Sequence, residues 1–248
     1  MTRKLPIFPI TLAAGTIGAA LRFLLYRIGP DDRGLLPRFH PLHILCLALT
    51  VVLAVYLFAA RKKAPSGNTT AGMPFTPLAL PGLLAALGLL LGCGFQLLEA
   101  LPQIDGRTDT LRIALPFAFA GCFLALAILA LLGKRPHYLV YAVLCAAFLL
   151  DMLVRYRVWS SNPQIPDYCF QVGASVFLTL SAYSRTALDT GMGSEGKYRF
   201  CCCMALCLCL MCVIGPDSRD FYPGCGCWIL AELLARRIRP EAADPAVE

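Results

Sequence analysis

Long apolar runs constrain this chain more than any other feature. Two of them, at residues 83–91 and 118–132, contain no polar side chain. Inside a bilayer each backbone amide must find its hydrogen-bond partner within the same segment, which a helix provides. A strand of a membrane β-barrel would instead alternate polar and apolar residues. The runs therefore predict helices and not strands.

The composition places these helices in lipid. Hydrophobic residues make up 58% of the 248-residue chain and charged residues only 15%, whereas about 25% of the residues in soluble domains are charged. The mean hydropathy is +0.68. A soluble globule would lack the polar residues to cover so much apolar side chain, but hydrocarbon solvates it directly. We therefore predict an integral membrane protein whose main partner is the lipid bilayer.

Eight apolar segments follow one another along the chain, most of them close to the roughly 20 residues that span a bilayer. They predict an all-α fold, a polytopic transmembrane helical bundle of about eight spans. Residues 1–240 form one transmembrane helical domain in this interpretation, and residues 241–248 form a short polar cytoplasmic tail. The predicted segments are residues 5–28, 41–60, 77–101, 111–132, 138–154, 168–184, 200–215 and 221–235.

Basic residues orient the bundle. If the amino terminus is cytoplasmic, the loops on the cytoplasmic side hold most of them, including Arg61–Lys63, Lys134 and Arg135. Because cytoplasmic loops are enriched in Lys and Arg, both termini are predicted to be cytoplasmic. The compact chain, without sorting signals, favours a bacterial plasma membrane. The net charge of +7 does not indicate nucleic-acid binding, since the basic residues form no patch with interleaved aromatic residues.

Glycines give the third segment a face for close helix contact. Gly88 and Gly92 are four residues apart and so lie on one face of a helix, which lets another backbone approach closely. We favour packing within the bundle. The alternative is contact with a membrane-protein partner or with a second copy of the chain.

Ionisable side chains at membrane depth are costly and often mark functional sites. Five polar residues fall in the predicted outer leaflet, near the ends of the first, third and fifth segments: Arg22, Gln96, Glu99, Asp151 and Arg155. They predict an outward-facing polar pocket, in which opposite charges offset each other's desolvation. The alternative is that these long side chains reach the interface and pair there structurally.

The predicted inner halves of the segments carry little polarity. Glu232 is the main exception, and Arg236, four residues later on the same helix face, is its expected partner. Because a transporter needs a polar route to the inner side, this pattern favours a sensor or accessory role over transport.

Thirteen cysteines are many for this length, and most of them follow residue 200. Cysteine packs well as a small apolar residue, and we favour packing as the explanation. Two alternatives involve Cys209, Cys212, Cys225 and Cys227 at the two sides of a short loop. These four thiols could form a zinc site or disulfides.

The sequence leaves the activity undetermined. No nucleophile–base pair is visible, so an enzyme is the least favoured class, and no cofactor is predicted. The first hypothesis is a membrane-embedded sensor or a small-solute binding or transport protein that uses the outer pocket. The others are a structural or assembly partner of another membrane protein, and a thiol or metal site at the cysteine-rich end.

Overall fold

The fold is described from a computed structural model, which places residues 7–29, 40–61, 80–104, 110–132, 134, 136–159, 165–214 and 221–237. Within these ranges the chain forms eight helices and no strand, which confirms the all-α prediction. The predicted tail at residues 241–248 lies outside them. The helices are α1 (Ile7–Ile28), α2 (Pro41–Arg61), α3 (Leu80–Ile104), α4 (Thr110–Leu131), α5 (Tyr138–Trp159), α6 (Ile165–Asp189), α7 (Glu195–Cys212) and α8 (Phe221–Arg237).

Four of the described helices are long and apolar enough to cross a membrane. They are α1, α2, the Ala114–Leu131 part of α4 and the Tyr138–Arg157 part of α5, and shorter apolar stretches occur in α3 and α8. α6 and α7 extend beyond the predicted apolar segments into charged residues such as Asp189 and Glu195. A helix does not have to end where its apolar sequence ends, because its backbone hydrogen bonds also form in water.

Large apolar side chains lie on the outside of the bundle. Ile17 on α1, Val52 and Val55 on α2, Leu87 on α3 and Leu153 on α5 are all more than half exposed. In water such surfaces mark interaction sites or aggregation hazards, whereas lipid solvates them. This apolar exterior fits a membrane protein.

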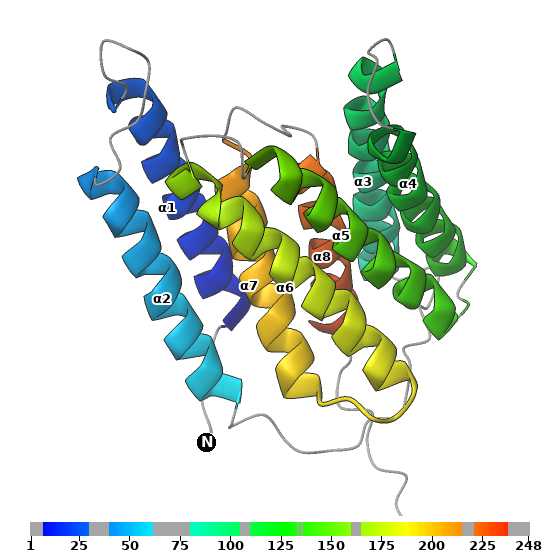
Figure 1. The fold of residues 1–248 in the computed structure, drawn as a ribbon. Coiled ribbons are helices and arrows are strands. Elements are labelled where there is room, and N and C mark those ends of the chain that lie inside the picture. Colours follow the sequence, from blue (N-terminus) through cyan, green and yellow to red (C-terminus); the bar gives the residue numbers. More distant parts are fainter. Residues whose placement is uncertain are drawn as a thin grey trace, which may run out of the picture.

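Six of the helices close into a ring (Figure 1). Going round it, α3 packs against α4, α4 against α5, α5 against α6, α6 against α7, and α7 against α8, which returns to α3. Outside the ring, α1 packs on α7, and α2 packs on both α1 and α7. We call the end of the bundle at which α1 ends and α8 begins the upper end, as in Figure 1, and the opposite end the lower end.

α7 is the most buried of the described helices. Every residue from 201 to 209 is buried, although these residues point in all directions around the helix. The stretch consists of Cys, Met, Ala and Leu only, and a helix that is apolar all round belongs in a core. Small thiol side chains let four neighbouring helices approach. Packing therefore explains this run of cysteines.

α3 and α8 approach each other closely at glycines. A Cβ added to Gly92 would lie 2.9 Å from the backbone oxygen of Gly224, and one added to Gly224 would lie 3.0 Å from the backbone oxygen of Gly92. Gly88 faces the same helix at Cys227 and Ala231. The predicted glycine face is therefore covered by α8 of the same chain. A partner or second copy would have to dock on another face.

Candidate functional site

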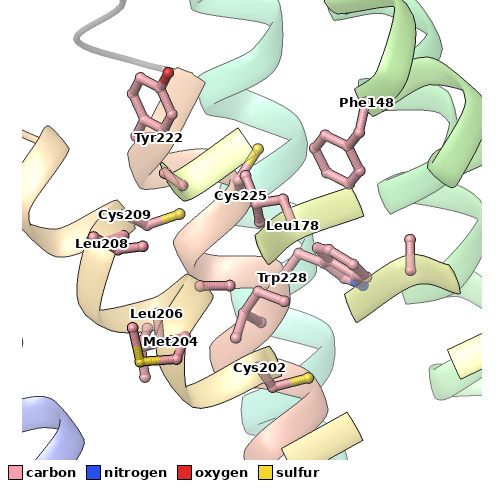
Figure 2. Close-up of a cluster of buried hydrophobic side chains, with 14 of the residues drawn as sticks. Phe148, Leu178, Cys202, Met204, Leu206, Leu208, Cys209, Tyr222, Cys225 and Trp228 are labelled. Carbon is pink, nitrogen blue, oxygen red and sulfur yellow. The ribbon is translucent and has the colours of Figure 1, made fainter. Parts of the chain in front are cut away.

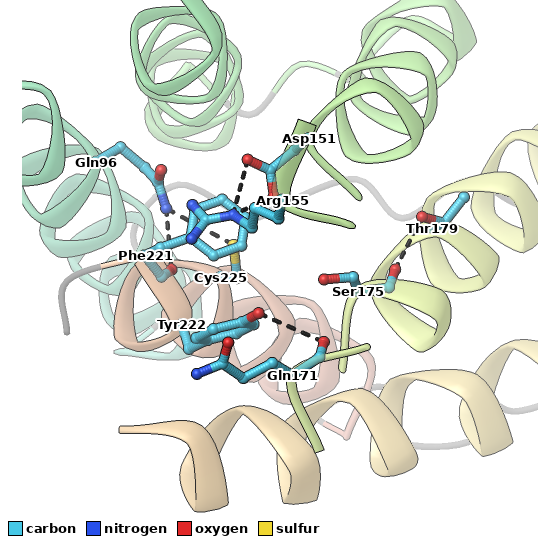
Figure 3. A network of polar contacts seen from close by, with 9 residues as sticks. All are labelled: Gln96, Asp151, Arg155, Gln171, Ser175, Thr179, Phe221, Tyr222 and Cys225. Carbon is cyan, nitrogen blue, oxygen red and sulfur yellow. Dashed lines mark hydrogen bonds and ion pairs between the residues drawn. The ribbon is translucent and has the colours of Figure 1, made fainter. Parts of the chain in front are cut away.

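Buried polar side chains gather near the upper end of the ring. We call this group the upper polar layer, and Figure 3 shows it together with the start of α8. Its members come from α3, α5, α6 and α8, and most are almost completely buried. They are Gln96, Asp151, Arg155, Gln171, Ser175 and Tyr222.

The charges of the upper polar layer pair within one helix. Arg155 Nε donates to both carboxylate oxygens of Asp151, at 2.8 and 3.0 Å. The Arg155 guanidinium also lies 4.2 Å above the ring of Phe221, so an aromatic face supports it from α8. The two residues are four apart and so share a helix face. The pair carries no net charge.

Gln96 joins α3 to the first turn of α8. Its Nε2 donates to the backbone oxygen of Phe221 at 3.0 Å and to the sulfur of Cys225 at 3.6 Å. The first of these hydrogen bonds lies where α3 and α8 approach each other closely. A Cβ on Gly224 would lie 2.8 Å from this nitrogen, so glycine at position 224 leaves the room that the amide occupies.

Two amide oxygens in this layer have no hydrogen-bond partner among the described residues. They are Oε1 of Gln96 and Oε1 of Gln171, and both side chains are at least 99% buried. Leaving a buried acceptor unpaired costs about 1–3 kcal/mol. A molecule that donates N–H or O–H hydrogen bonds to them would recover that energy.

Arg22 belongs to a different part of the upper end. Its Nη1 donates to the backbone oxygen of Met211 at 3.3 Å and its Nη2 to the hydroxyl oxygen of Tyr26 at 2.8 Å. Its guanidinium also lies 5.1 Å from the ring centre of Phe170. Met211 is in the last turn of α7, where carbonyl groups lack helical partners and a cation is stabilised. Arg22 therefore anchors the end of α7 to α1.

The predicted pocket residues are thus brought together in part. Gln96, Asp151 and Arg155 meet around the start of α8, whereas Arg22 lies among α1, α6 and α7. The side chain of Glu99 lies outside the described residues. Asp151 is paired with Arg155, so it does not depend on Arg22 to offset its charge.

A second group of polar side chains, most of them buried, lies near the lower end of the ring. We call Tyr141, Arg185, Asp189, Tyr198 and Glu232 the lower polar layer. The hydroxyl of Tyr141 donates to Glu232 Oε1 at 2.6 Å, and that of Tyr198 donates to Oε2 at 3.0 Å. Arg185 Nη2 lies 3.5 Å from an Asp189 oxygen, and its guanidinium lies 5.1 Å from the Tyr141 ring centre.

The expectation that the inner halves carry little polarity is therefore wrong for the described residues. Arg185 looks in the sequence like a loop cation and Tyr198 like an interface aromatic, yet 6% of Arg185 and none of Tyr198 is exposed. Tyr141 differs from exposed Tyr138 only in its helix face. The side chain of Arg236, the expected partner of Glu232, lies outside the described residues.

Aromatic side chains fill the ring between the two layers. Trp228 stacks on Phe123 with ring centres 6.0 Å apart and packs on Phe148 at 5.6 Å; Figure 2 shows it beside Phe148 and Leu178. Tyr141 and Asp151 are ten residues apart on α5, so the layers are about 15 Å apart along the bundle. The Trp228 Nε1 is buried without a hydrogen-bond partner among the described residues.

The four predicted metal ligands do not converge. Among the described residues, no group of three His, Cys, Asp or Glu side chains could hold a metal ion. All thirteen cysteines are described and unbridged, so the disulfide alternative is not realised. Cys225 and Cys227 are two residues apart on a helix and point to different sides. Cys225 accepts from Gln96, whereas Cys212 accepts from Arg22 at 3.9 Å.

Chemically, the ring contains two polar layers and an aromatic layer between them. Comparison with family models, with curated proteins and with solved structures finds no match to this chain. These layers are therefore the features of the molecule that point to a function. The upper layer offers hydrogen-bond acceptors beside a neutral ion pair, and the lower layer offers a buried carboxylate beside hydroxyl groups and a guanidinium.

Proposed function

We propose that this protein binds a small polar solute at the upper polar layer and transports it across a membrane. In this proposal the chain spans the plasma membrane of a bacterium eight times, with both termini in the cytoplasm. The upper layer then faces outward and the lower layer faces the cytoplasm. The observation that carries the proposal is the pair of buried amide oxygens without partners, on Gln96 and Gln171.

The chemistry of the upper layer suggests the class of solute. Each unpaired acceptor favours a molecule that carries N–H or O–H donors. Because Asp151 and Arg155 already neutralise each other, a solute without net charge fits better than an ion. Small amides, polyols and zwitterionic amines meet both conditions.

The lower layer supports transport over sensing alone. A transporter needs polar groups on both sides of a central barrier, and the described helices carry them on the same ring. α5 contributes Asp151 above and Tyr141 below, and α6 contributes Ser175 above and Arg185 below. The aromatic layer around Trp228 would then be the barrier that opens and closes.

Thermal unfolding of the detergent-purified protein with chosen solutes tests the solute site. The probes are acetamide, glycerol and glycine, with trimethylglycine as a zwitterion that lacks N–H donors. A ligand at 100 times its Kd stabilises the folded state by about 2.7 kcal/mol. We expect a saturable rise in Tm with at least one donor-bearing probe and none with trimethylglycine.

Variants locate the site. Gln171→Met keeps the size of the side chain and removes the amide, so it should abolish the rise in Tm. Tyr183→Phe removes one hydroxyl from an exposed position on the same helix and should leave the rise unchanged. Absence of a saturable shift with every probe, or an equal shift in Gln171→Met, would count against the proposal.

A structural partner of another membrane protein is the second candidate. The observation in its favour concerns α2. The principal packing contacts of this helix are with α1 and α7, and Val51, Val52 and Val55 are left exposed. Replacing Val52 and Val55 by alanine should then reduce co-purification of a partner without changing Tm. Unchanged co-purification would remove α2 as the docking surface.

A further inference from the structure

We propose that Cys169, at the upper end of the bundle, is a reactive thiol that His43 activates and that forms mixed disulfides with small-molecule disulfides. The Cys169 sulfur lies 3.7 Å from Nε2 of His43. A thiol beside an imidazole is an arrangement that generates a nucleophilic thiolate in proteins. The inference concerns a different site from the solute site, and it stands even if the upper polar layer binds nothing.

Cys169 is the one exposed thiol among the thirteen cysteines. Three others, Cys122, Cys145 and Cys227, are partly exposed, and the remaining nine are buried. Cys169 lies in the second turn of α6, and this helix begins at the upper end (Figure 1). Attack on a dissolved reagent needs an accessible sulfur. Accessibility therefore singles out Cys169 for thiol chemistry.

The imidazole of His43 is positioned by the helix that carries the thiol. His43 lies near the start of α2 and is half-buried, and its ring meets the ring of buried Phe170 edge to face, with ring centres 5.3 Å apart. The imidazole thus contacts α6 both at the Cys169 sulfur and at the next residue. A base held in this way stays within reach of the thiol proton. Cys169 and His43 are 126 positions apart in the chain, so only the tertiary structure brings them together.

Two other thiols make contacts of a different kind. The sulfur of Cys46 donates to the backbone oxygen of Gly18 at 3.9 Å, and that of Cys145 donates to the backbone oxygen of Thr179 at 3.8 Å. A backbone carbonyl accepts a hydrogen bond but does not take up the proton, whereas a neutral imidazole does so near neutral pH. The contact of Cys169 is therefore the one of these three that can generate a thiolate.

A metal site is the alternative use of a Cys–His pair, since zinc binds both side chains. Structural zinc sites have four ligands. Among the residues that the structure describes, no group of three His, Cys, Asp or Glu side chains could hold a metal ion. The geometry at Cys169 and His43 therefore favours thiol chemistry.

The reaction is a thiol–disulfide exchange. Nε2 of His43 takes the proton of the Cys169 thiol, and the thiolate attacks one sulfur of the small disulfide. A new S–S bond forms at Cys169 while the S–S bond of the small molecule breaks. The departing thiolate takes the proton back from His43 and leaves as a thiol. In the topology proposed above, the upper end faces the oxidising side of the membrane, where disulfides persist.

Dithiobis(nitrobenzoate), a charged aromatic disulfide that releases a yellow thiolate on exchange, tests the inference. The full-length protein in a non-ionic detergent is treated at neutral pH, and the modified peptide is mapped by mass spectrometry. An unassisted thiol is only a few per cent thiolate at this pH. We therefore expect Cys169 to react about tenfold faster than N-acetylcysteine in the same buffer. Cys169→Ser should abolish the fast reaction.

Histidine variants separate activation from mere exposure. His43→Gln keeps a polar side chain of similar size and removes the base, so the reaction of Cys169 should slow by about tenfold. His137→Gln changes an exposed histidine just before α5, at the lower end, and should leave the rate unchanged. Both variants should keep the Tm of the wild type. If His43→Gln does not fold, the comparison of the wild-type protein with N-acetylcysteine still decides.

Three results would overturn the inference. They are a rate at Cys169 no higher than that of N-acetylcysteine, equal rates in the wild type and in folded His43→Gln, and protection of Cys169 by an equimolar amount of Zn²⁺. The last result would assign the pair to a metal ion. None of these outcomes depends on whether acetamide, glycerol or glycine binds at the upper polar layer.

Discussion

Replacing Gly92 by alanine tests the contact that holds α3 against α8. The new Cβ would lie 2.9 Å from the backbone oxygen of Gly224 and 3.4 Å from Cδ2 of Phe123. The oxygen belongs to a helix backbone and cannot rotate away, so the two helices must separate. Such overpacking typically costs about 1–3 kcal/mol.

The same substitution at Gly94 is a matched control. Gly94 lies two residues later on α3, and a Cβ there would meet no atom within 4 Å. Alanine is favoured over glycine in a helix interior by about 1 kcal/mol, and both variants gain this term. Gly94→Ala should therefore be stabilised by about 1 kcal/mol. Gly92→Ala should be less stable than Gly94→Ala by the whole overpacking cost, about 1–3 kcal/mol.

Gly88→Ala gives an intermediate case, because its Cβ would lie 3.4 Å from the backbone oxygen of Cys227. The expected order of thermal stability is Gly94→Ala, then Gly88→Ala, then Gly92→Ala. At about 2–4 °C per kcal/mol for a chain of this size, Gly92→Ala and Gly94→Ala should differ in Tm by about 2–12 °C.

The buried thiols supply the assay. Most cysteines are buried and all are free, so a maleimide dye that fluoresces on reaction reports unfolding during a temperature ramp. Equal Tm values for Gly92→Ala and Gly94→Ala would refute the close approach of α3 and α8. A change of oligomeric state in Gly92→Ala at unchanged Tm would instead assign the glycine face to contact between copies.

Three further predictions concern buried charges and topology. Arg22→Met should lower the free energy of unfolding by about 1–3 kcal/mol, because the carbonyl of α7 that Arg22 binds is left unpaired. At the exposed position 27, Arg27→Met should change it by no more than about 0.5 kcal/mol. Equal losses in the two variants would refute the anchoring role of Arg22. Asp151→Asn should lower the free energy of unfolding by about 3–5 kcal/mol, because it leaves a largely buried guanidinium without its carboxylate. An unchanged free energy of unfolding would show that the pair is solvated. An impermeant amine reagent should label both Lys134 and Lys197, which are exposed, only from the cytoplasmic face; labelling of one from each face would refute the proposed threading.

Several features of the candidate site follow from the sequence. Asp151 and Arg155 are four residues apart, so a helix places them on one face whatever surrounds it. Gln96 and Glu232 stand out because polar residues are rare inside apolar segments. The glycines at 88 and 92 likewise indicate a close helix contact, although the sequence does not say with which helix.

Other parts of the site depend on helix faces that meet from distant parts of the chain. Tyr138 and Tyr141 are the same residue type one turn apart, and only the ring geometry turns Tyr141 toward Glu232 and leaves Tyr138 exposed. Arg22 and Asp151 lie at similar predicted depths in their apolar segments. Arg22 nevertheless contacts α7, whereas Asp151 pairs with Arg155 on α5. A pattern within one helix fixes depth and face, but not which neighbour that face meets.

By itself, then, the sequence determined that the described chain is helical and apolar enough for lipid, because backbone pairing within a segment and side-chain hydropathy are local properties. The order of the helices around the ring, the partners of Arg22 and Glu232, and the separation of the cysteines at the end of α7 and the start of α8 were decided only by the tertiary structure. Those depend on which faces pack together, and packing joins residues that the sequence keeps far apart.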